Sequence, residues 1–350
     1  MSFLKKTIDN HRALPVAKQT LIDATVLKTI DTGVLLVMPA EESVSAHKLV
    51  ISSGIHGNET APMEIVDGLI SSIYDGQLTV RTPVLFIIGN PLAAKEQVRF
   101  VDDNLNRLFD GQHRNYNSPE AARAKLLEEV VSDFYSTDTF SKDTFTKDTY
   151  SADTFSKGLG PTGMRLHYDL HTAIRGSELE KFAVYPYLND RTWNKSQIGF
   201  LEQCGIEGVL LSNQPAGTFS YFTSHRFGAH SFTIELGKVR KFGENDMRKF
   251  DAMDQGLRRI ISGEEVFNNA LRSIKLFSVV EEVIKRSDAL QLHIADDAKN
   301  FTEYPVNSLL ASDVDYEYRT QVDGERFVFP IKNVPCGQRA MLVVAPTRLD

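Results

Sequence analysis

A histidine and a glutamate stand three positions apart, directly after an apolar stretch of the chain. The run Leu-Val-Ile-Ser-Ser at 49–53 predicts a buried strand, and the turn that follows Gly54 carries His56 and Glu59. An imidazole and a carboxylate at this spacing can bind one divalent cation if the turn folds back on itself. The pair is equally compatible with a surface histidine beside a solvated glutamate, so the choice depends on a third ligand.

His171 is a candidate for that third ligand. It follows a strand-like run at 165–170 and precedes a polar segment at 172–177. Two histidines and one glutamate leave a fourth position on zinc open for water, which is typical of catalytic zinc sites. The same ligand set also binds Fe(II) in oxygenases. We expect such oxygenases to be all-β barrels, so the alternation of strands and helices in this chain favours a zinc hydrolase.

Four short motifs follow one another along the first three quarters of the chain. They are Gly-Ile-His-Gly-Asn-Glu at 54–59, Asp-Asn-Leu-Asn-Arg at 103–107, Asp-Leu-His-Thr at 169–172 and Thr-Ile-Glu-Leu-Gly-Lys at 233–238. Together they resemble the aspartoacylase and succinylglutamate desuccinylase branch of the zinc carboxypeptidases, with the greatest similarity to its desuccinylase members. The resemblance implies an α/β fold, with a mixed, mainly parallel sheet flanked by helices.

The resemblance also implies roles for individual residues. One Zn²⁺ per chain would be bound by His56, Glu59 and His171, and Glu235 would be the catalytic glutamate. The remaining implied roles are oxyanion stabilisation by Arg99 and substrate binding by Asn106, Arg107 and Arg175. Aspartoacylases also carry an arginine some ten residues before the catalytic glutamate, and this chain has His225-Arg226 in that region.

The activity that the resemblance implies is hydrolysis of the amide bond of N-succinyl-L-glutamate to succinate and L-glutamate, the last step of arginine catabolism by the succinyltransferase pathway. Glu235 would take a proton from water and pass it to the leaving amine. An aspartoacylase-like deacylase of N-acyl amino acids and a carboxypeptidase are alternatives that use the same site. A metal-binding protein without catalysis is a third alternative, but it has no need of a base at Glu235.

Alternating strand and helix patterns are expected to position these residues. A hairpin at 22–38 leads to the strand at 49–53, and helical spacing follows at 61–74 before a second apolar strand at 83–89. A strand, a helix and a strand of these lengths predict a parallel crossover unit. Ligands bind at the carboxyl ends of strands in open α/β sheets, which is where His56 falls.

The second half of the catalytic region continues the pattern. The sequence predicts helices at 118–134, 191–203 and 246–261 and strands at 165–170, 182–188, 208–211 and 231–236. Because alternate side chains of a strand share a face, His167, Asp169 and His171 should point the same way. Asp169 is then a candidate acceptor for the ring of a metal-bound His171, and His167 is more typical of a packed histidine.

Residues 136–155 contain four tandem copies of Ser/Thr-x-Asp-Thr-Phe/Tyr. A period of five gives no single buried face on a helix or a strand, so we expect a low-complexity surface insertion. From residue 274 onwards, short β-rich runs separated by Asp, Gly and Pro turns predict a small all-β domain. We therefore expect a catalytic domain at 1–262 and a C-terminal β-rich domain at 263–350.

Composition narrows the class of protein. The 350 residues are 42% hydrophobic and 24% charged, with a net charge of −7 and a pI near 5.8. An acidic chain without clustered basic residues argues against binding to nucleic acid or to an anionic membrane. Two distant cysteines give no disulfide framework, no signal peptide is evident, and no run approaches the ~20 apolar residues of a membrane span. We expect a cytoplasmic enzyme acting on a small-molecule N-acyl amino acid, and the oligomeric state stays open.

Overall fold

The structure is a computed structural model that describes residues 2–11, 13, 15–40, 45–136 and 163–349. Apart from Ser136, the repeats at 136–155 lie outside the described residues, so their expected surface position stays a prediction. Among the described helices, none has both the length and the apolar character needed to cross a bilayer.

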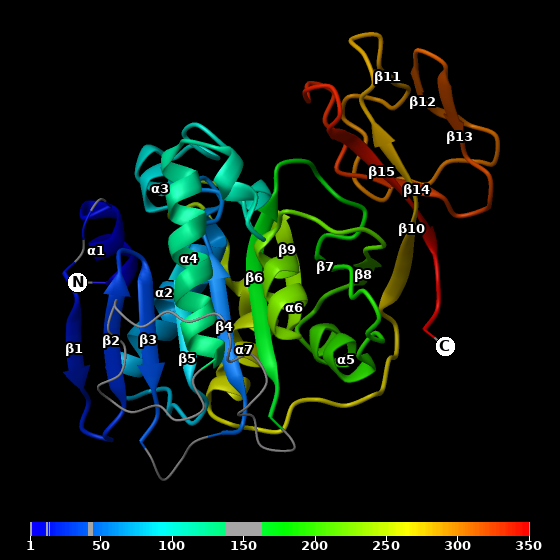
Figure 1. Ribbon diagram of the computed structural model, residues 1–350. Coiled ribbons are helices and arrows are strands. Elements are labelled where there is room, and N and C mark those ends of the chain that lie inside the picture. Colours follow the sequence, from blue (N-terminus) through cyan, green and yellow to red (C-terminus); the bar gives the residue numbers. More distant parts are fainter. Residues whose placement is uncertain (1, 12, 14, 41–44, 137–162, 350) are drawn as a thin grey trace.

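Twelve of the described strands form one sheet, in the order β1-β2-β3-β5-β4-β6-β9-β7-β8-β10-β15-β14 (Figure 1). Its centre is parallel, because β4 pairs in parallel with both β5 and β6, and β6 pairs in parallel with β9. The expected mixed sheet with a parallel core is confirmed. The strands of the catalytic region are β1 Ala17–Thr20, β2 Val26–Asp31, β3 Val34–Met38, β4 Lys48–Ser53, β5 Val84–Ile88, β6 Arg165–Ala173, β7 Phe182–Tyr185, β8 Gly208–Leu211 and β9 His230–Lys238.

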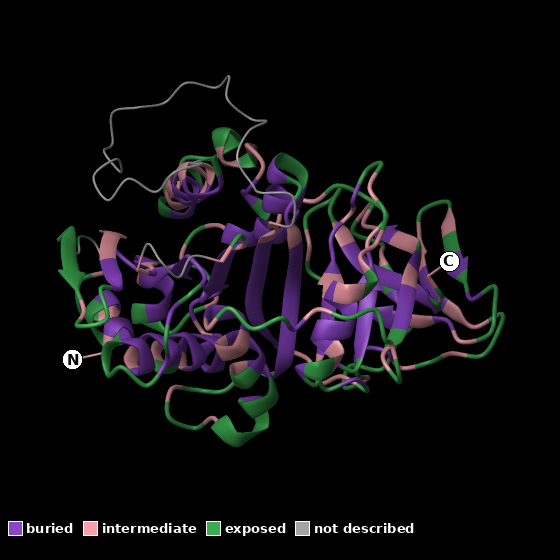
Figure 2. Cartoon of the chain, turned by 90° about the horizontal axis from the view of Figure 1, so that it is seen from below, coloured by how far each residue is buried: buried purple, intermediate pink, exposed green. Residues whose placement is uncertain are grey.

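Helices cover both faces of this sheet. Side chains of α2, α5 and α7 pack with one apolar cluster, and side chains of α4 and α6 pack with another on the opposite face. Figure 2 shows the buried central strands between these two layers. The helices are α1 Phe3–Asp9, α2 Thr60–Tyr74, α3 Pro91–Glu96, α4 Pro119–Ser136, α5 Lys195–Gln203, α6 Phe219–Phe227 and α7 Asp251–Ile261, with the 3₁₀ turns η2 Leu105–Arg107, η3 Gln112–Asn115 and η4 Met247–Phe250.

In β6 and β9, apolar and polar side chains alternate between the two faces of the sheet. In β6, Leu166, Tyr168 and Leu170 belong to the cluster under α2, and in β9 the same cluster takes Phe232, Ile234 and Leu236. Successive side chains of a strand point to opposite faces. The intervening residues therefore face the α4 and α6 side, where they bring polar groups together: His167, Asp169 and His171 from β6, and Ser231, Thr233 and Glu235 from β9.

Helix α6 was not expected from the sequence, which predicted no helix between β8 and β9. Thr218 caps its N-terminus by accepting a hydrogen bond from the Tyr221 backbone, and Gly228 ends it with a φ of 62°. A glycine suits that left-handed position because it has no Cβ. The prediction that strand character ends at residue 170 was also wrong, because β6 continues to Ala173 and contains His171.

The C-terminal region contributes strands to the same sheet. The first residues of β10 pair in parallel with β8, and the later ones pair with β15 in the smaller part of the molecule. Strands β11, β12 and β13 form a separate three-stranded sheet with its own apolar cluster. A domain boundary at 262/263 stays a prediction. The strands are β10 Lys275–Ile284, β11 Gln291–Leu292, β12 Leu309–Asp313, β13 Tyr316–Arg319, β14 Arg326–Val328 and β15 Arg339–Pro346.

Candidate active site

The structure brings His56, Glu59 and His171 together in one buried cluster. One possible ligand atom from each residue lies within 4.8 Å of the other two, so the three side chains could hold a metal ion. The Glu59 carboxylate is the centre of the group, because its two oxygens lie 2.8 Å from Nδ1 of His56 and 2.9 Å from Nδ1 of His171. The backbone N–H of Thr172 donates a further hydrogen bond to Glu59 at 3.0 Å.

Local packing explains how the turn after β4 presents these ligands. A Cβ on Gly57 would lie 2.1 Å from the carbonyl carbon of Ala93, so the turn can lie against α3 only with glycine at this position. The N–H of Gly57 donates to the carbonyl of Arg99, which fixes the turn against the segment after β5. His56 and Glu59 then lie beside the end of β6, where His171 emerges from the sheet.

The charges of the cluster favour a cation. Burial alone would raise the pKa of Glu59, but His56 and His171 hold it well below its usual value. Burial lowers the pKa of His56 to about 4 against the pull of Glu59, whereas Asp169 and Glu59 overcome burial and raise the pKa of His171. The two carboxylates therefore favour the protonated form of His171. A divalent cation would supply the same positive charge to the same ligands, which must be deprotonated to bind it.

A chain of hydrogen bonds supports His171 from behind. Its Nε2 lies 2.9 Å from Asp169, and the other oxygen of Asp169 accepts from the Ser52 hydroxyl at 2.5 Å. Ser52 is also 2.8 Å from Nε2 of His167, whose Nδ1 lies 2.8 Å from the hydroxyl of Thr223 in α6. The chain fixes the ring orientation of His171, which is the usual role of a carboxylate beside a metal-binding histidine.

Glu235 adds a buried carboxylate at the edge of this cluster. Its side chain lies across from His171 in the register of β6 and β9, and its Oε2 has no hydrogen-bond partner among the described residues. Burial and, to a smaller extent, the negative charge of Glu59 raise the pKa of Glu235 to about 7, against the opposing effect of His171. A buried acceptor without a partner is costly unless a ligand or a water uses it. The donor set and this free oxygen both fit a bound metal with its water.

The segment after β5 carries the predicted substrate contacts. Arg99 donates to Glu59 at 2.8 Å, so its guanidinium lies directly at the cluster. Asn106 is buried, and its amide oxygen accepts from the backbone N–H of Phe219, which ties η2 to the start of α6. Arg107 donates only to the carbonyl of Asn106 among its described hydrogen bonds, so the charged end of its side chain has no acidic partner there.

Arg175 lies away from the other predicted contacts. It donates hydrogen bonds to the carbonyls of Asp296 and Ala298, at 2.9 and 2.5 Å. These bonds fasten the segment after His171 to the C-terminal region. A role for Arg175 in substrate binding is untested, and in this conformation its guanidinium is occupied by backbone carbonyls.

Sequence reasoning missed two residues that hold the cluster. Asn104 places its amide oxygen 3.0 Å from Nε2 of His56, and Ser52 links Asp169 to His167. A serine inside an otherwise apolar strand is a signal for Ser52, because a buried hydroxyl needs a partner. Asn104 lies in a motif that carries Asn106 and Arg107, but nothing in its spacing connects it to His56.

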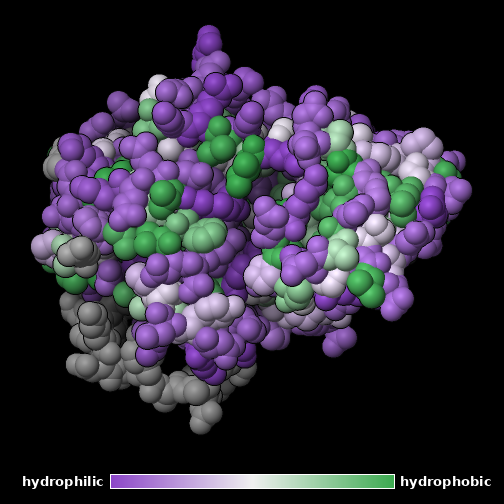
Figure 3. Space-filling view, turned by 90° about the horizontal axis from the view of Figure 1, so that it is seen from above, coloured by the Kyte–Doolittle hydropathy of each residue, from purple (hydrophilic) through white to green (hydrophobic). Residues whose placement is uncertain are grey.

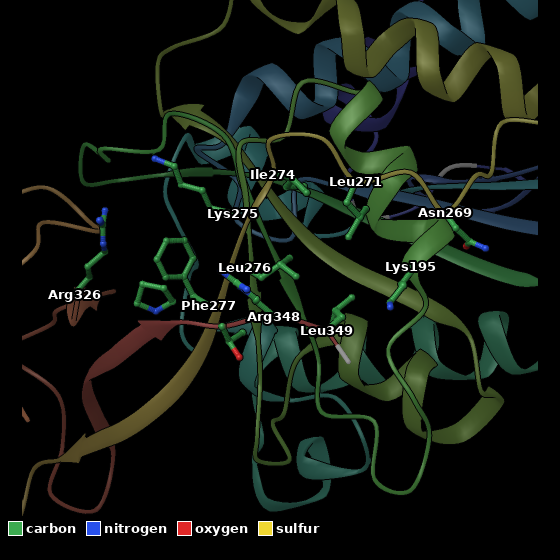
Figure 4. Close-up of a pocket in the computed structure, with 12 residues that line it drawn as sticks. Lys195, Asn269, Leu271, Ile274, Lys275, Leu276, Phe277, Arg326, Arg348 and Leu349 are labelled. Carbon is green, nitrogen blue, oxygen red and sulfur yellow. The ribbon is translucent and has the colours of Figure 1, made fainter. Parts of the chain in front are cut away.

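A cavity of about 580 Å³ lies elsewhere on the molecule, where residues 346–349 pass the start of β10 (Figure 4). None of the cluster residues lines it. Its cationic lining residues are Lys195, Lys275, Arg326 and Arg348. Strand β10 is three strands along the sheet from β9, so this cavity is separate from the metal cluster.

The chain matches two family descriptions over most of its length. Residues 45–148 and 143–261 match the succinylglutamate desuccinylase/aspartoacylase catalytic domain, and residues 272–347 match the AstE/AspA barrel-sandwich hybrid domain. The chain belongs to the succinylglutamate desuccinylase/aspartoacylase family. Membership confirms the predicted resemblance and makes the protein an enzyme of this family, with the buried cluster inside the catalytic match.

Relatives in this family are similar to nearly the whole chain. A protein of Pseudoalteromonas atlantica named succinylglutamate desuccinylase is 44% identical over 339 residues, which cover 95% of this chain and 90% of the relative. The structure of succinylglutamate desuccinylase from Chromobacterium violaceum has a TM-score of 0.83 and 36% identity, covering 99% of this chain and 98% of its own. The structure of succinylglutamate desuccinylase from Vibrio cholerae has a TM-score of 0.85 and 33% identity, and the match covers 99% of this chain and 95% of that one.

Proposed function

We propose that the protein hydrolyses the amide bond of N-succinyl-L-glutamate to succinate and L-glutamate. The observation that carries this proposal is the near full-length similarity to proteins named succinylglutamate desuccinylase, which includes the C-terminal region. The His56, Glu59 and His171 cluster supports it, because it lies beside Glu235, whose Oε2 has no partner among the described residues, and this arrangement suits metal-assisted amide hydrolysis. A cytoplasmic location and a role in arginine degradation stay predictions.

Zinc is the metal that we propose for the cluster, held by His56, Glu59 and His171. A site of three protein ligands with nitrogen and oxygen donors is typical of catalytic zinc. When bound, zinc lowers the pKa of a coordinated water towards ~7 and polarises the scissile carbonyl. Asp169 orients the His171 ring in this arrangement, and Asn104 orients the ring of His56.

Glu235 acts as the proton carrier. Its buried Oε2 takes the proton of the attacking water and delivers it to the nitrogen of the leaving glutamate. A carboxyl group with a pKa near neutrality suits both steps, because it must accept a proton and release it again within one turnover. Arg99 lies at the cluster and places a fixed positive charge where the carbonyl oxygen becomes negative.

Substrate selection is assigned to the arginines around the cluster. N-succinylglutamate carries three carboxylates, and the chain is acidic overall, so local guanidinium groups must hold the substrate. Arg107 and Arg175 are the predicted contacts, with Asn106 holding the loop that carries Arg107. A planar guanidinium can bind a carboxylate through two parallel hydrogen bonds.

The deciding experiment is turnover of the zinc-loaded protein on a panel of amides. The panel contains N-succinylglutamate, N-acetylglutamate, N-acetylaspartate and a dipeptide, and released amine is measured for each to obtain kcat/KM. We expect N-succinylglutamate to lead by at least ~10²-fold, the cost of losing one charged contact. A comparable kcat/KM for N-acetylaspartate would reject the assignment in favour of an aspartoacylase-like deacylase.

Two controls make the panel interpretable. Zinc per chain is measured on the same preparation, because an empty site and a wrong substrate both give low turnover. Glu235→Gln is assayed beside the native protein, so that a contaminating hydrolase is recognised by activity that survives the substitution.

A further inference from the structure

Glu120 is a buried carboxylate in the first turn of α4, and its two oxygens accept four hydrogen bonds from the described residues. One oxygen accepts from the side-chain amide of Asn90 at 3.1 Å and from the backbone N–H of Val101 at 2.7 Å. The other accepts from the backbone N–H groups of Asp102 and Asp103, each at 3.4 Å. The carboxylate thus ties α4 to the end of β5 and to the segment that follows α3.

Residues 101–103 lie between two side chains that contact the cluster. Arg99, two residues before them, donates to Glu59 at 2.8 Å. Asn104 follows them directly and places its amide oxygen 3.0 Å from Nε2 of His56. A shift of residues 101–103 would therefore move both contacts, because no more than one residue separates this stretch from either side chain.

Apolar packing does little to hold Arg99 in place. Its neighbours Val98 and Phe100 are each 38% exposed, so neither is buried in the core. In Figure 1, α3 and the beginning of α4 lie at the top of the larger body, and Figure 3 shows that hydrophilic side chains cover most of the surface seen from this side. The segment that carries Arg99 therefore depends on hydrogen bonds for its position, to Glu120 and to the N–H of Gly57.

A carboxylate is suited to the position of Glu120 because all four of these partners are N–H donors. An ionised glutamate only accepts hydrogen bonds and offers about four lone-pair sites, which matches this donor set. The first turn of a helix also favours negative charge, since its N–H groups have no partners within the helix. Glutamine would have the same size, but either orientation of its amide turns an NH2 group towards N–H groups.

We propose that Glu120 is a positioning residue for amide hydrolysis, which holds residues 101–103 so that the Arg99 guanidinium stays beside the cluster. Its described hydrogen bonds reach none of the three cluster residues, so it acts through the segment. The proposal rests on the proposed function, in which Arg99 stabilises the negative charge that develops on the carbonyl oxygen. Such an interaction acts on the transition state, so its loss lowers kcat and leaves KM nearly unchanged.

The test is a double-mutant cycle with Glu120→Gln and Arg99→Ala, assayed on zinc-loaded protein with N-succinylglutamate. Because a misplaced group costs much of its effect, Glu120→Gln alone should lower kcat roughly 10- to 100-fold and change KM by less than about threefold. In the Arg99→Ala background, the same substitution should lower kcat by less than about threefold, since the group that it positions is gone. Additive losses would show that Glu120 acts independently of Arg99 and would overturn the proposal, as would a native kcat for Glu120→Gln.

The matched control is Glu128→Gln, about two turns further along α4. Glu128 also accepts from a backbone N–H, that of Gly111 at 3.0 Å. Its substitution should leave kcat at the native value even if the melting temperature falls. Glu120→Asp keeps the charge but reaches fewer donors, and it takes the place of Glu120→Gln in the cycle if the glutamine variant does not fold. Zinc per chain is measured on every variant, so that an empty site is not read as a misplaced Arg99.

Hydrogen exchange in residues 99–107 supplies a readout that needs no substrate. The N–H groups of residues 101–103 should exchange faster in Glu120→Gln than in the native protein or in Glu128→Gln, because they lose their acceptor. Native exchange rates in Glu120→Gln would overturn the proposal. The proposed function fails in a different way, when the native protein does not prefer N-succinylglutamate, and the cycle is then run on the amide that it cleaves best.

Discussion

His171 and Glu235 face each other across β6 and β9 as register partners on adjacent parallel strands. His171 belongs to the cluster that could hold a metal ion, and Glu235 carries the oxygen that has no partner among the described residues. The sheet therefore fixes the separation between the cluster and the proposed base, because neighbouring strands lie about 4.8 Å apart. Neither residue depends on a mobile loop for its position.

This relationship gives a prediction for Glu235→Gln. The amide keeps the size of the side chain but cannot accept the proton of water, so kcat should fall by ~10² or more while bound zinc stays near the native amount. Steady-state kinetics and metal analysis on the same sample measure both quantities. Glu264→Gln, at an exposed position after α7, is the matched control and should retain native kinetics. A variant at Glu235 that keeps most of its turnover removes this residue from the mechanism.

The cluster predicts the effect of removing each ligand. His56→Ala, Glu59→Ala and His171→Ala should each lower the zinc content sharply, because three protein ligands leave no spare donor. Metal content per chain after dialysis against a weak chelator is the measurement, and His293→Ala, at an exposed histidine of the C-terminal region, is the control. Native zinc content in all three variants would place the metal elsewhere.

The hydrogen bonds that Asp169 makes beside His171 predict a smaller effect on zinc binding than loss of a ligand. Asp169→Asn weakens the contact that orients the ring, so zinc affinity should fall by about 10- to 100-fold without loss of the fold. Competition with a chromophoric chelator measures the affinity. Ser52→Ala removes a hydrogen bond to Asp169 without touching His171 and should have a weaker effect. If Ser52→Ala and Asp169→Asn are equally damaging, the whole hydrogen-bonded chain acts as one unit.

The lowered pKa of His230 should make the stability of the protein depend on pH. Burial, with help from Arg191, lowers the pKa of this histidine to about 4, and its ring lies 3.2 Å from the hydroxyl of Tyr185. The folded state therefore holds His230 neutral, whereas the unfolded chain takes up a proton below pH ~6.5. The stability contributed by the neutral ring is complete above that pH and is lost as the pH falls towards 4.

Melting temperatures of the native protein and His230→Gln between pH 8 and pH 4.5 test this. The native protein should lose more stability than the variant across that range, because glutamine does not titrate. His293→Gln should follow the native curve. Parallel curves for native and His230→Gln would show that the acid sensitivity comes from other groups.

Much of the catalytic region could be predicted because its pattern is local. Apolar residues alternate with polar ones in β6 and β9, and the hydrogen bonds of Asp169 and His171 follow from that alternation. Helix α6 could not be predicted in this way, because it packs against the sheet and α4 and buries residues around most of its circumference. Without a polar stripe, a helix has no amphipathic period to detect.

The contacts between Arg175 and the C-terminal region could not be predicted for a different reason. The sequence spacing between Arg175 and Ala298 carries no signal, since the two residues meet only when the C-terminal region docks against the segment after β6. The C-terminal region was expected to be β-rich, and its β strands were found, but its sequence gave no sign that the carbonyls of Asp296 and Ala298 bind Arg175. Tertiary contacts of this kind become visible only in three dimensions.

The flanks of the tandem repeats have a consequence for engineering. The chain leaves the described fold at the end of α4 and returns at the start of β6, where Arg165 donates to the carbonyl of Tyr135 at 3.3 Å and buried Lys48 donates to the carbonyls of Phe134 and Tyr135. The end of α4 and the start of β6 are thus held together by hydrogen bonds that do not involve the segment between them. For a flexible engineered linker, halving or doubling the length changes the closure free energy by only about 0.6 kcal/mol. The junction is therefore a suitable place to exchange the natural segment for an affinity handle or a fluorescent reporter.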